Sequence, residues 1–229
     1  MVVLRALGAL LTYPRPELRA ALAEIRAVLA GSPLVDPVRR GRLETLIAGL
    51  RASDPLELEQ RYVALFDTGR ATCLWLFEHV HGESRDRGQA MVDLKSVYER
   101  AGFRLVGNEL PDYLPALLEY LSYRDLAEAR DMLADCAHIL RKIGERLAAG
   151  GSHYAAVFDA LLGIAAQPTF DLQVATPPAP VLPEDLARVD EEWMDAPAFA
   201  AGEQRATTAP RETPIRFMPR NARQQRGAS

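Results

Sequence analysis

Residues 124–149 read RDLAEARDMLADCAHILRKIGERLAA, the longest stretch of helical pattern in the chain. Its apolar residues recur at alternating spacings of three and four, which makes a seam suited to antiparallel helix packing. The residues of this seam are Leu126, Ala129, Leu133, Cys136, Leu140, Ile143 and Leu147. The pattern predicts one long helix over 124–149, with Cys136 in the core.

The same periodicity extends outward from this stretch and recurs from residue 2 to about residue 166. Turn signals divide it into further predicted helices at about 2–12, 16–30, 37–49, 55–67, 85–101, 111–122 and 152–166. Asp54 and Pro55 are typical of a helix start, and Gly102 is typical of a helix end. Tyr62, Leu65 and Phe66 share one helix face and are predicted to lie in the core.

Composition supports an all-α fold. Hydrophobic residues make up 48% of the chain and aromatic residues 7%, and Ala and Leu outnumber Val and Ile, which favours helix over sheet. We predict a single multi-helix bundle domain over residues 1–166. The formal net charge of −4 gives no basic field of the kind that attracts nucleic acid.

The cysteines and the first residues indicate where the protein works. Cys73 and Cys136 are far apart and form no CxxC pair, which argues against a disulfide framework or a zinc module. The opening MVVLRALGALLTYP is interrupted by Arg5 and is interpreted as a core helix, not a signal peptide. No apolar run is long enough to span a membrane. We expect a cytoplasmic protein without stable membrane association.

Residues 167–229 differ in character from the rest. Nine of the sixteen prolines lie there, and no helical pattern is sustained. We predict a mostly disordered tail, with a possible short docking helix at 184–195.

The stretch FEHVHGESRDRGQAM at 77–91 concentrates charged residues and histidine. A metal site would use His79 and His81, but ligands at i and i+2 converge only on an extended segment, and no second ligand pair follows. A catalytic centre would need a nucleophile or phosphate-binding motif, and none is present. These two hypotheses are the weaker ones.

A structural role for this cluster is the stronger alternative, because its charges can pair with one another and fix a connection between helices. Arg85 and Arg87 do not suit that account, since the macrodipole disfavours cations in the first turn of a helix. We therefore expect these arginines to meet carboxylates or a ligand elsewhere.

Two longer segments resemble a known family. RYVALFDTGRAT at 61–72, followed by LFEHVHGESRDRGQAMVDL at 76–94, is similar to the NarJ family, the delta-subunit assembly chaperones of respiratory nitrate reductase. ELPDYLPALLEYL at 109–121 looks like the acidic-proline-aspartate motif of the broader TorD-like maturation chaperones. The motif usually ends in histidine, and this chain has Tyr113 there, which cannot become cationic. VDEEWMDAPAF at 189–199 resembles an acidic tail segment less specifically.

The resemblance implies a TorD-like bundle that is not an enzyme. Such chaperones bind the apo form of the catalytic molybdenum (alpha) subunit, including its N-terminal peptide. They hold it for insertion of the iron–sulfur cluster and the molybdenum cofactor, before it docks at the membrane. The chaperone keeps no cofactor stably bound. The alternatives are a chaperone for a different molybdenum oxidoreductase and a metal-dependent enzyme using His79 and His81.

The charged cluster, which belongs to the first motif (61–72 with 76–94), and the second motif (109–121) supply the candidate client-binding residues. They are Glu78, His79, His81, Glu83, Arg85, Asp86, Arg87, Gln89, Glu109, Pro111 and Asp112. The acidic members are expected to pair with basic residues of the client, and the arginines with its carboxylates or with phosphates. An alternative for 109–115 is a plain helix start, with Asp112 as the cap and Pro115 in the first turn.

Overall fold

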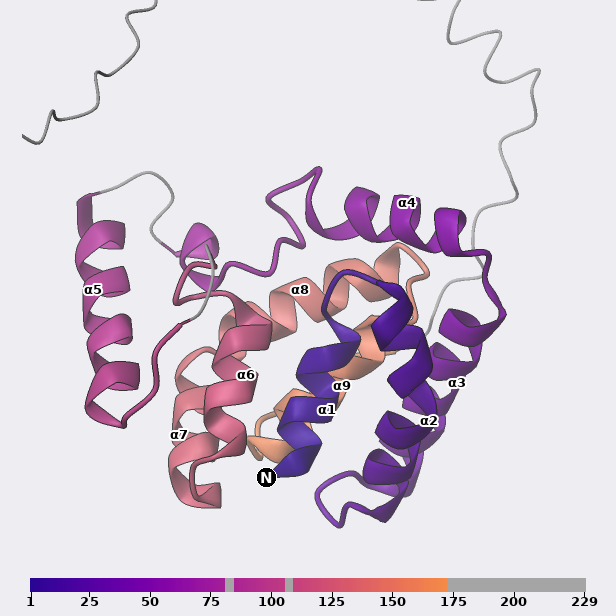
Figure 1. The fold of residues 1–229 in the computed structure, drawn as a ribbon, viewed down its shortest axis with the longest axis horizontal. Helices are drawn as coiled ribbons and strands as arrows, with labels where there is room; N and C mark the ends of the chain where they lie inside the picture. Colours follow the sequence, from indigo (N-terminus) through magenta and orange to yellow (C-terminus); the bar gives the residue numbers. More distant parts are fainter. Residues whose placement is uncertain (81–84, 106–108, 173–229) are drawn as a thin grey trace, which may run out of the picture. The chain divides into compact units, whose positions relative to one another are not determined.

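The fold was analysed in a computed structural model that describes residues 1–80, 85–105 and 109–172. In this part of the chain the regular elements are nine α-helices and one short 3-10 helix, with no strand, as Figure 1 shows. They are α1 (Val2–Leu10), α2 (Pro16–Gly31), α3 (Pro37–Ala52), α4 (Pro55–Phe66), η1 (Leu76–His79), α5 (Arg85–Arg100), α6 (Leu114–Ser122), α7 (Leu126–Asp135), α8 (Ala137–Ala149) and α9 (Ala155–Ile164). The predicted all-α class is confirmed. The predicted tail, including 184–195, lies outside the described residues.

Aspartates begin three of these helices. The side chain of Asp36 accepts hydrogen bonds from the amides of Val38 and Arg39, and that of Asp54 caps α4 in the same way. Asp125 accepts from the Glu128 amide, 2.9 Å away, at the start of α7. Each cap satisfies amides that have no partner inside the helix.

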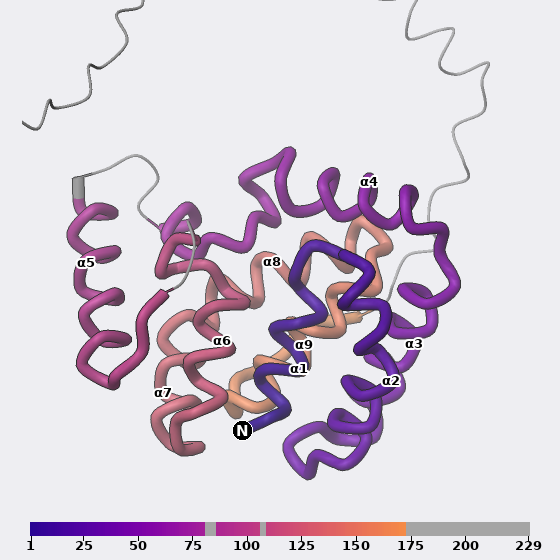
Figure 2. The backbone as a smooth tube through the Cα atoms, viewed as in Figure 1, coloured from indigo at the N-terminus to yellow at the C-terminus, as the bar shows by residue number. Residues whose placement is uncertain are grey.

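Helix α9 occupies the centre of the bundle. It packs against α1, α3, α7 and α8, and the tube in Figure 2 shows it running behind α1. All of its residues except Gly163 are buried, as expected for a helix that is apolar on every side. Helix α1 lies close to α6, where a Cβ on Gly8 would come within 3.2 Å of Leu118 Cβ. Glycine permits this close approach.

The prediction of one helix over 124–149 is wrong, because the chain bends at Cys136 between α7 and α8. Cys136 has φ −97° and ψ 7°, and its thiol lies 3.4 Å from the Met132 carbonyl oxygen and 3.5 Å from that of Leu133. A side chain that bonds to carbonyls of the preceding turn competes with the helical ladder. The apolar periodicity continues across the bend, so the sequence pattern conceals it. Cys136 itself is only partly buried.

The helix predicted from about residue 111 begins later, at Leu114. Tyr113 pairs with Trp75 in an isolated antiparallel bridge, which keeps Tyr113 extended, and Asp112 lies in the turn before it. Asp112 therefore does not cap α6, although Pro115 does lie in its first turn. Gly102, with φ +82°, follows the end of α5 as predicted.

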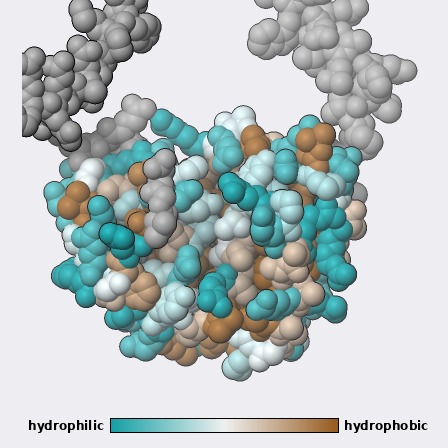
Figure 3. Space-filling model, viewed as in Figure 1, coloured by the Kyte–Doolittle hydropathy of each residue, from teal (hydrophilic) through white to brown (hydrophobic). Residues whose placement is uncertain are grey.

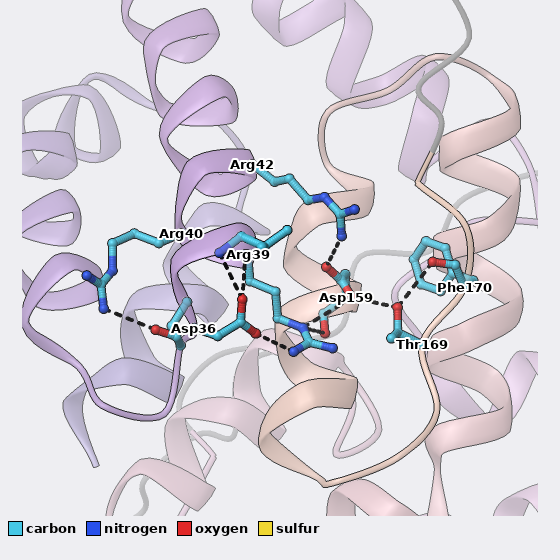
Figure 4. Close-up of polar contacts among 9 residues, drawn as sticks. Asp36, Arg39, Arg40, Arg42, Asp159, Thr169 and Phe170 are labelled. Atoms are coloured by element: carbon cyan, nitrogen blue, oxygen red, sulfur yellow. Dashed lines mark hydrogen bonds and ion pairs between the residues drawn. The ribbon is translucent and has the colours of Figure 1, made fainter.

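A buried carboxylate joins α3 to α9 (Figure 4). The side chain of Asp159 is fully buried and accepts hydrogen bonds from Arg39 Nε at 3.2 Å and Arg42 Nη1 at 2.7 Å. Arg39 also pairs with Asp36 at the start of α3. Thr169 Oγ1 donates a third bond to the Asp159 side chain, at 2.7 Å. The network compensates for burying the charge.

The segment after α9 follows this network across the bundle. Phe170 is only 9% exposed and lies over Gly144 of α8, where a Cβ would fall 2.3 Å from its ring. Arg141 Nη1 donates to the Thr169 carbonyl at 3.1 Å. The packed chain therefore continues past Ala166 to Phe170. The domain boundary at 166 remains a prediction.

The surface in Figure 3 shows hydrophobic residues in separate patches among hydrophilic ones. Among the described helices, none has the length and apolar character needed to cross a membrane.

Candidate functional site

A groove with a volume of about 940 Å³ runs over α1 and α6. Its remaining walls come from the start of α2 and from residues 98–105 at the end of α5. Among the described residues, six aromatic side chains line it: Tyr13, Tyr98, Phe103, Tyr113, Tyr120 and Tyr123. A concave site of this size with convergent aromatic rings is suited to an apolar ligand or peptide face.

Four of the rings form a connected series of tilted and edge-on contacts along one wall. The centroids of Tyr98 and Tyr120 lie 4.7 Å apart, and Phe103 packs against both Tyr120, at 5.5 Å, and Tyr123, at 5.3 Å. Tyr98 donates its hydroxyl to the Pro111 carbonyl at 2.8 Å, and Tyr120 donates to Glu128 at 3.1 Å. Tyr98 and Tyr120 are only 2% and 5% exposed, so the ring surface that a ligand can reach on this wall comes mainly from Phe103 and Tyr123.

Tyr13 and Tyr113 line another part of the groove, and both contact the buried Tyr62. Tyr62 donates to the Leu11 carbonyl at 2.8 Å, its hydroxyl lies 3.5 Å from that of Tyr113, and its ring packs edge-on against Tyr13. Burial raises the pKa of both Tyr62 and Tyr113, so these hydroxyls stay neutral. Tyr62 is buried in the core, as predicted.

The chain at residues 74–76 pairs with residues 112–114 of the second motif, on both sides of Tyr113. The Leu76 amide donates to the Asp112 carbonyl at 3.1 Å, and the Leu114 amide donates to the Leu74 carbonyl at 2.8 Å. The ring of Trp75 packs on that of Tyr113, with centroids 5.7 Å apart. The first motif therefore positions a residue that lines the groove.

Asp112 is fully buried at this junction. Its Oδ2 accepts from the Phe77 amide at 3.0 Å, which makes it a cap for η1. Its Oδ1 has no hydrogen-bond partner within the described part of the chain. Burial raises the pKa of this carboxyl, and the Phe77 amide and the charge of Arg87 partly oppose that rise.

Glu78 and Arg87 join η1 to α5. Arg87 Nη1 lies 2.5 Å from Glu78 Oε1, and Arg70 Nε lies 3.9 Å from Glu78 Oε2. Helix α5 begins at Arg85, so both arginines fall in its first turn, as predicted. Glu78 belongs to the same 77–91 stretch, so the pair with Arg87 is the internal pairing that the structural alternative predicted and not a contact elsewhere. The side chain of Arg85 lies outside the described part.

His79 faces the protein interior. Its Nε2 lies 3.0 Å from the Cys73 carbonyl oxygen and 3.5 Å from the Cys73 sulfur. Burial lowers the pKa of His79 and raises that of Cys73, which favours the neutral form of each. Over the described ranges, no three His, Cys, Asp or Glu side chains are grouped to hold a metal ion.

The other predicted residues are dispersed. Asp86 is exposed, and Gln89 donates to Asp93 on its own helix at 2.8 Å. Glu109 lines the groove, whereas Pro111 is buried beside Tyr98. The predictions for His81 and Glu83 lie outside the described residues.

The sequence analysis did not identify most of the groove. Arg5, Thr12, Phe103 and Tyr123 line it but belong to no motif. One signal was available, because four of the seven tyrosines lie between positions 98 and 123. Such a concentration of amphipathic rings indicates a surface used for contacts.

Comparisons with known proteins agree with the two motifs. The family described as nitrate reductase delta subunit matches residues 14–160. The chain is 45% identical over 165 residues to the Escherichia coli K12 protein named nitrate reductase molybdenum cofactor assembly chaperone NarJ, covering 72% of this chain and 70% of that protein. It is 41% identical over 169 residues to the probable chaperone NarW of the same strain, covering 72% and 68%.

The chain is also similar to a less closely related chaperone. The probable NarJ chaperone of Bacillus subtilis is 32% identical over 161 residues, covering 70% of this chain and 86% of that protein. The residues that match the family, 14–160, include both motif segments and the junction that they form. This chain belongs to the nitrate reductase delta subunit family.

Proposed function

We propose that this chain is a maturation chaperone, not an enzyme, and that its client is the apo catalytic subunit of a respiratory nitrate reductase. The observation that carries the proposal is the 45% identity to a protein named as a nitrate reductase molybdenum cofactor assembly chaperone. The groove supplies a physical basis, because it offers a client segment an aromatic surface on a helical framework.

In this proposal the groove binds the N-terminal peptide of the client as an amphipathic helix. The apolar face of that helix would lie against the rings of Phe103, Tyr113 and Tyr123. Part of the binding energy of such a contact is offset by the cost of ordering the peptide, so binding is reversible. Reversible binding suits a chaperone that must release its client. The junction of Asp112, Trp75 and Tyr113 would support the groove from behind.

The remaining steps concern the client. The chaperone would hold the apo-subunit away from its membrane anchor, in the cytoplasm, until the iron–sulfur cluster and the molybdenum cofactor are inserted. That cofactor is cargo of the client, and the chaperone would keep none of it bound. Family similarity and the helical groove support this course of events.

Two alternatives are distinguishable. A chaperone for another molybdenum oxidoreductase would retain that apo-enzyme in preference to the nitrate reductase subunit. An enzyme using His79 and His81 would hold a stoichiometric metal ion, which elemental analysis of the purified protein would detect.

Copurification of the chain with the apo catalytic subunit tests the proposal. Ala116→Arg places a long cation in the groove and should reduce recovery of the subunit at least about tenfold, since it blocks the aromatic surface. Ala127→Arg on the exposed side of α7 is the matched control and should recover as much subunit as the unmodified chain. Equal recovery with both variants would contradict the role of the groove.

A further inference from the structure

The charges around the groove are separated along its length. Helices α1 and α6 run antiparallel along it. Gly8 of α1 lies against Pro115 and Leu118, whereas Leu11, after the end of α1, is bonded to the Tyr62 hydroxyl, which also contacts Tyr113 before the start of α6. The first turn of α1, with Arg5, therefore lies toward Glu119 and Tyr123. The link from α1 to α2 lies at the Tyr113 end.

The Tyr113 end carries an excess of carboxylates. Glu17 and Glu109 line it and are exposed, against one cation, Arg15. Glu59 and Asp67 lie near Tyr13 at this end. Burial and these two carboxylates raise the pKa of Tyr13, and the charge of Arg15 opposes the rise. Within the described part of the chain, neither Glu17 nor Glu109 takes part in an ion pair.

The Tyr123 end carries an excess of cations. Arg5 lines it, and Arg104 lines the groove next to Phe103, against the single carboxylate of Glu119. Over the described ranges, neither Arg5 nor Arg104 forms an ion pair. Glu128 is also near this end, but it forms an ion pair with Arg124, whose guanidinium lies 5.7 Å from the centre of the Tyr120 ring. Glu128 therefore does not remove the excess of positive charge.

A bound helix has its own polarity. Its N-terminus carries a partial positive charge from the macrodipole, and its C-terminus a partial negative charge. An N-terminal segment adds the positive α-amino group, which is largely protonated at neutral pH. Such a helix is attracted to the groove more strongly in one direction than in the other.

We infer that the groove binds the N-terminal helix of its client in a single orientation, with the peptide N-terminus beside Glu17 and Glu109 and its C-terminal end beside Arg5 and Tyr123. This inference rests on the proposed function and adds the direction of binding and the charge pattern of the ligand. The preferred ligand has its cations in the first turn and its carboxylates in the last.

The direction is measured with a synthetic peptide from the N-terminus of the co-encoded catalytic subunit, carrying a nitroxide at one end or the other. A nitroxide at the N-terminal end should broaden the amide signals of Glu17 and Glu109 in NMR spectra of the full chain. One at the C-terminal end should broaden those of Arg5 and Tyr123. The reverse pattern, or equal broadening at both ends, would overturn the inference.

Charge reversal gives an independent readout. Glu17→Lys with Glu109→Lys should weaken binding of the unlabelled peptide about fivefold at low salt and less at high salt, because exposed pairs are screened. Asp131→Lys with Asp135→Lys, on the exposed side of α7, makes the same change in net charge and should leave affinity within about twofold. Equal weakening by both pairs would contradict a local acidic end.

Failure of the inference is distinguishable from failure of the proposed function. If the apo-subunit still copurifies while the peptide binds in both directions, or does not bind, the inference is overturned and the chaperone function stands. If the apo-subunit also fails to copurify, both are overturned.

Discussion

At the scale of single residues, Asp112 shows how the second motif acts in this fold. Its sequence position suggested a cap for the following helix, but its carboxyl caps η1 instead and is fully buried. The sequence could not predict this, because the Phe77 amide reaches Asp112 only after residues 74–76 pair with 112–114. Identifying the motif therefore did not reveal its structural role.

The raised pKa of Asp112 predicts a pH dependence of stability. A carboxyl whose folded pKa exceeds its unfolded value favours folding at low pH, and this contribution is lost as the pH rises from the ordinary value of 3.8 through the folded pKa. Asp112→Asn removes the titration. The free energy of unfolding of this variant, relative to the unmodified chain, should rise over that window in denaturant titrations. A difference that is constant with pH would contradict the assignment.

Gly144 is a second residue with a defined role, because Phe170 occupies the space of a Cβ there. Gly144→Ala should displace the ring and lower the free energy of unfolding by about 1–2 kcal/mol, despite the better helix propensity of alanine. In a Phe170→Ala background the same change should cost less, because only the contact with the Phe158 Cβ at 3.0 Å then remains. Thermal and denaturant unfolding of the four proteins measure this coupling, and purely additive effects would contradict it.

At the scale of elements, the sequence predicted helices better than the joints between them. Apart from α7 and α8, which the pattern merged into one, apolar periodicity located the described α-helices to within a few residues, because it reflects burial of one face. The bend at Cys136 was missed, since a thiol that bonds to earlier carbonyls leaves that periodicity intact. The groove was missed because its walls come from four separate segments that only the fold brings together.

The pair of Glu78 and Arg87 is the polar link between η1 and α5. Glu78→Gln and Arg87→Ala should each lower stability modestly, and a double-mutant cycle should give a coupling of about 1 kcal/mol, because both side chains are partly buried. We also expect Arg87→Ala to reduce maturation of the client. A coupling indistinguishable from zero would show that the pair does not hold the two elements together.

The segment after α9 defines the end of the packed domain. A chain ending at Leu172 should be as stable as the full chain, whereas one ending at Ala166 should lose about 3 kcal/mol, since it lacks Phe170 and the Thr169 bond to Asp159. Denaturant unfolding of both truncated chains tests this. Equal stability would place the boundary at 166, as the sequence analysis predicted.

At the scale of the whole molecule, the fold presents an aromatic groove that the 109–121 segment lines through Glu109, Tyr113 and Tyr120, and Trp75 supports that groove at Tyr113. The predicted site residues do not form one cluster: Glu109 lines the groove, and Asp112 lies in the junction that supports Tyr113. Glu78 and Arg87 join η1 to α5, and Gln89 bonds to Asp93 on its own helix. Sequence resemblance identified the motif segments but not the surface, because Tyr98 and Phe103, which pack against Tyr120 of the second segment, belong to no motif.

Calorimetric titration of the full chain with the N-terminal peptide of the co-encoded catalytic subunit tests the central claim most directly. We predict saturable binding with a stoichiometry of one and a dissociation constant on the order of micromolar, as is common for reversible recognition of a helix in a groove. Ala116→Arg should abolish the heat of binding, and Ala127→Arg should not. No binding at about tens of micromolar peptide, together with no recovery of the apo-subunit, would contradict the account.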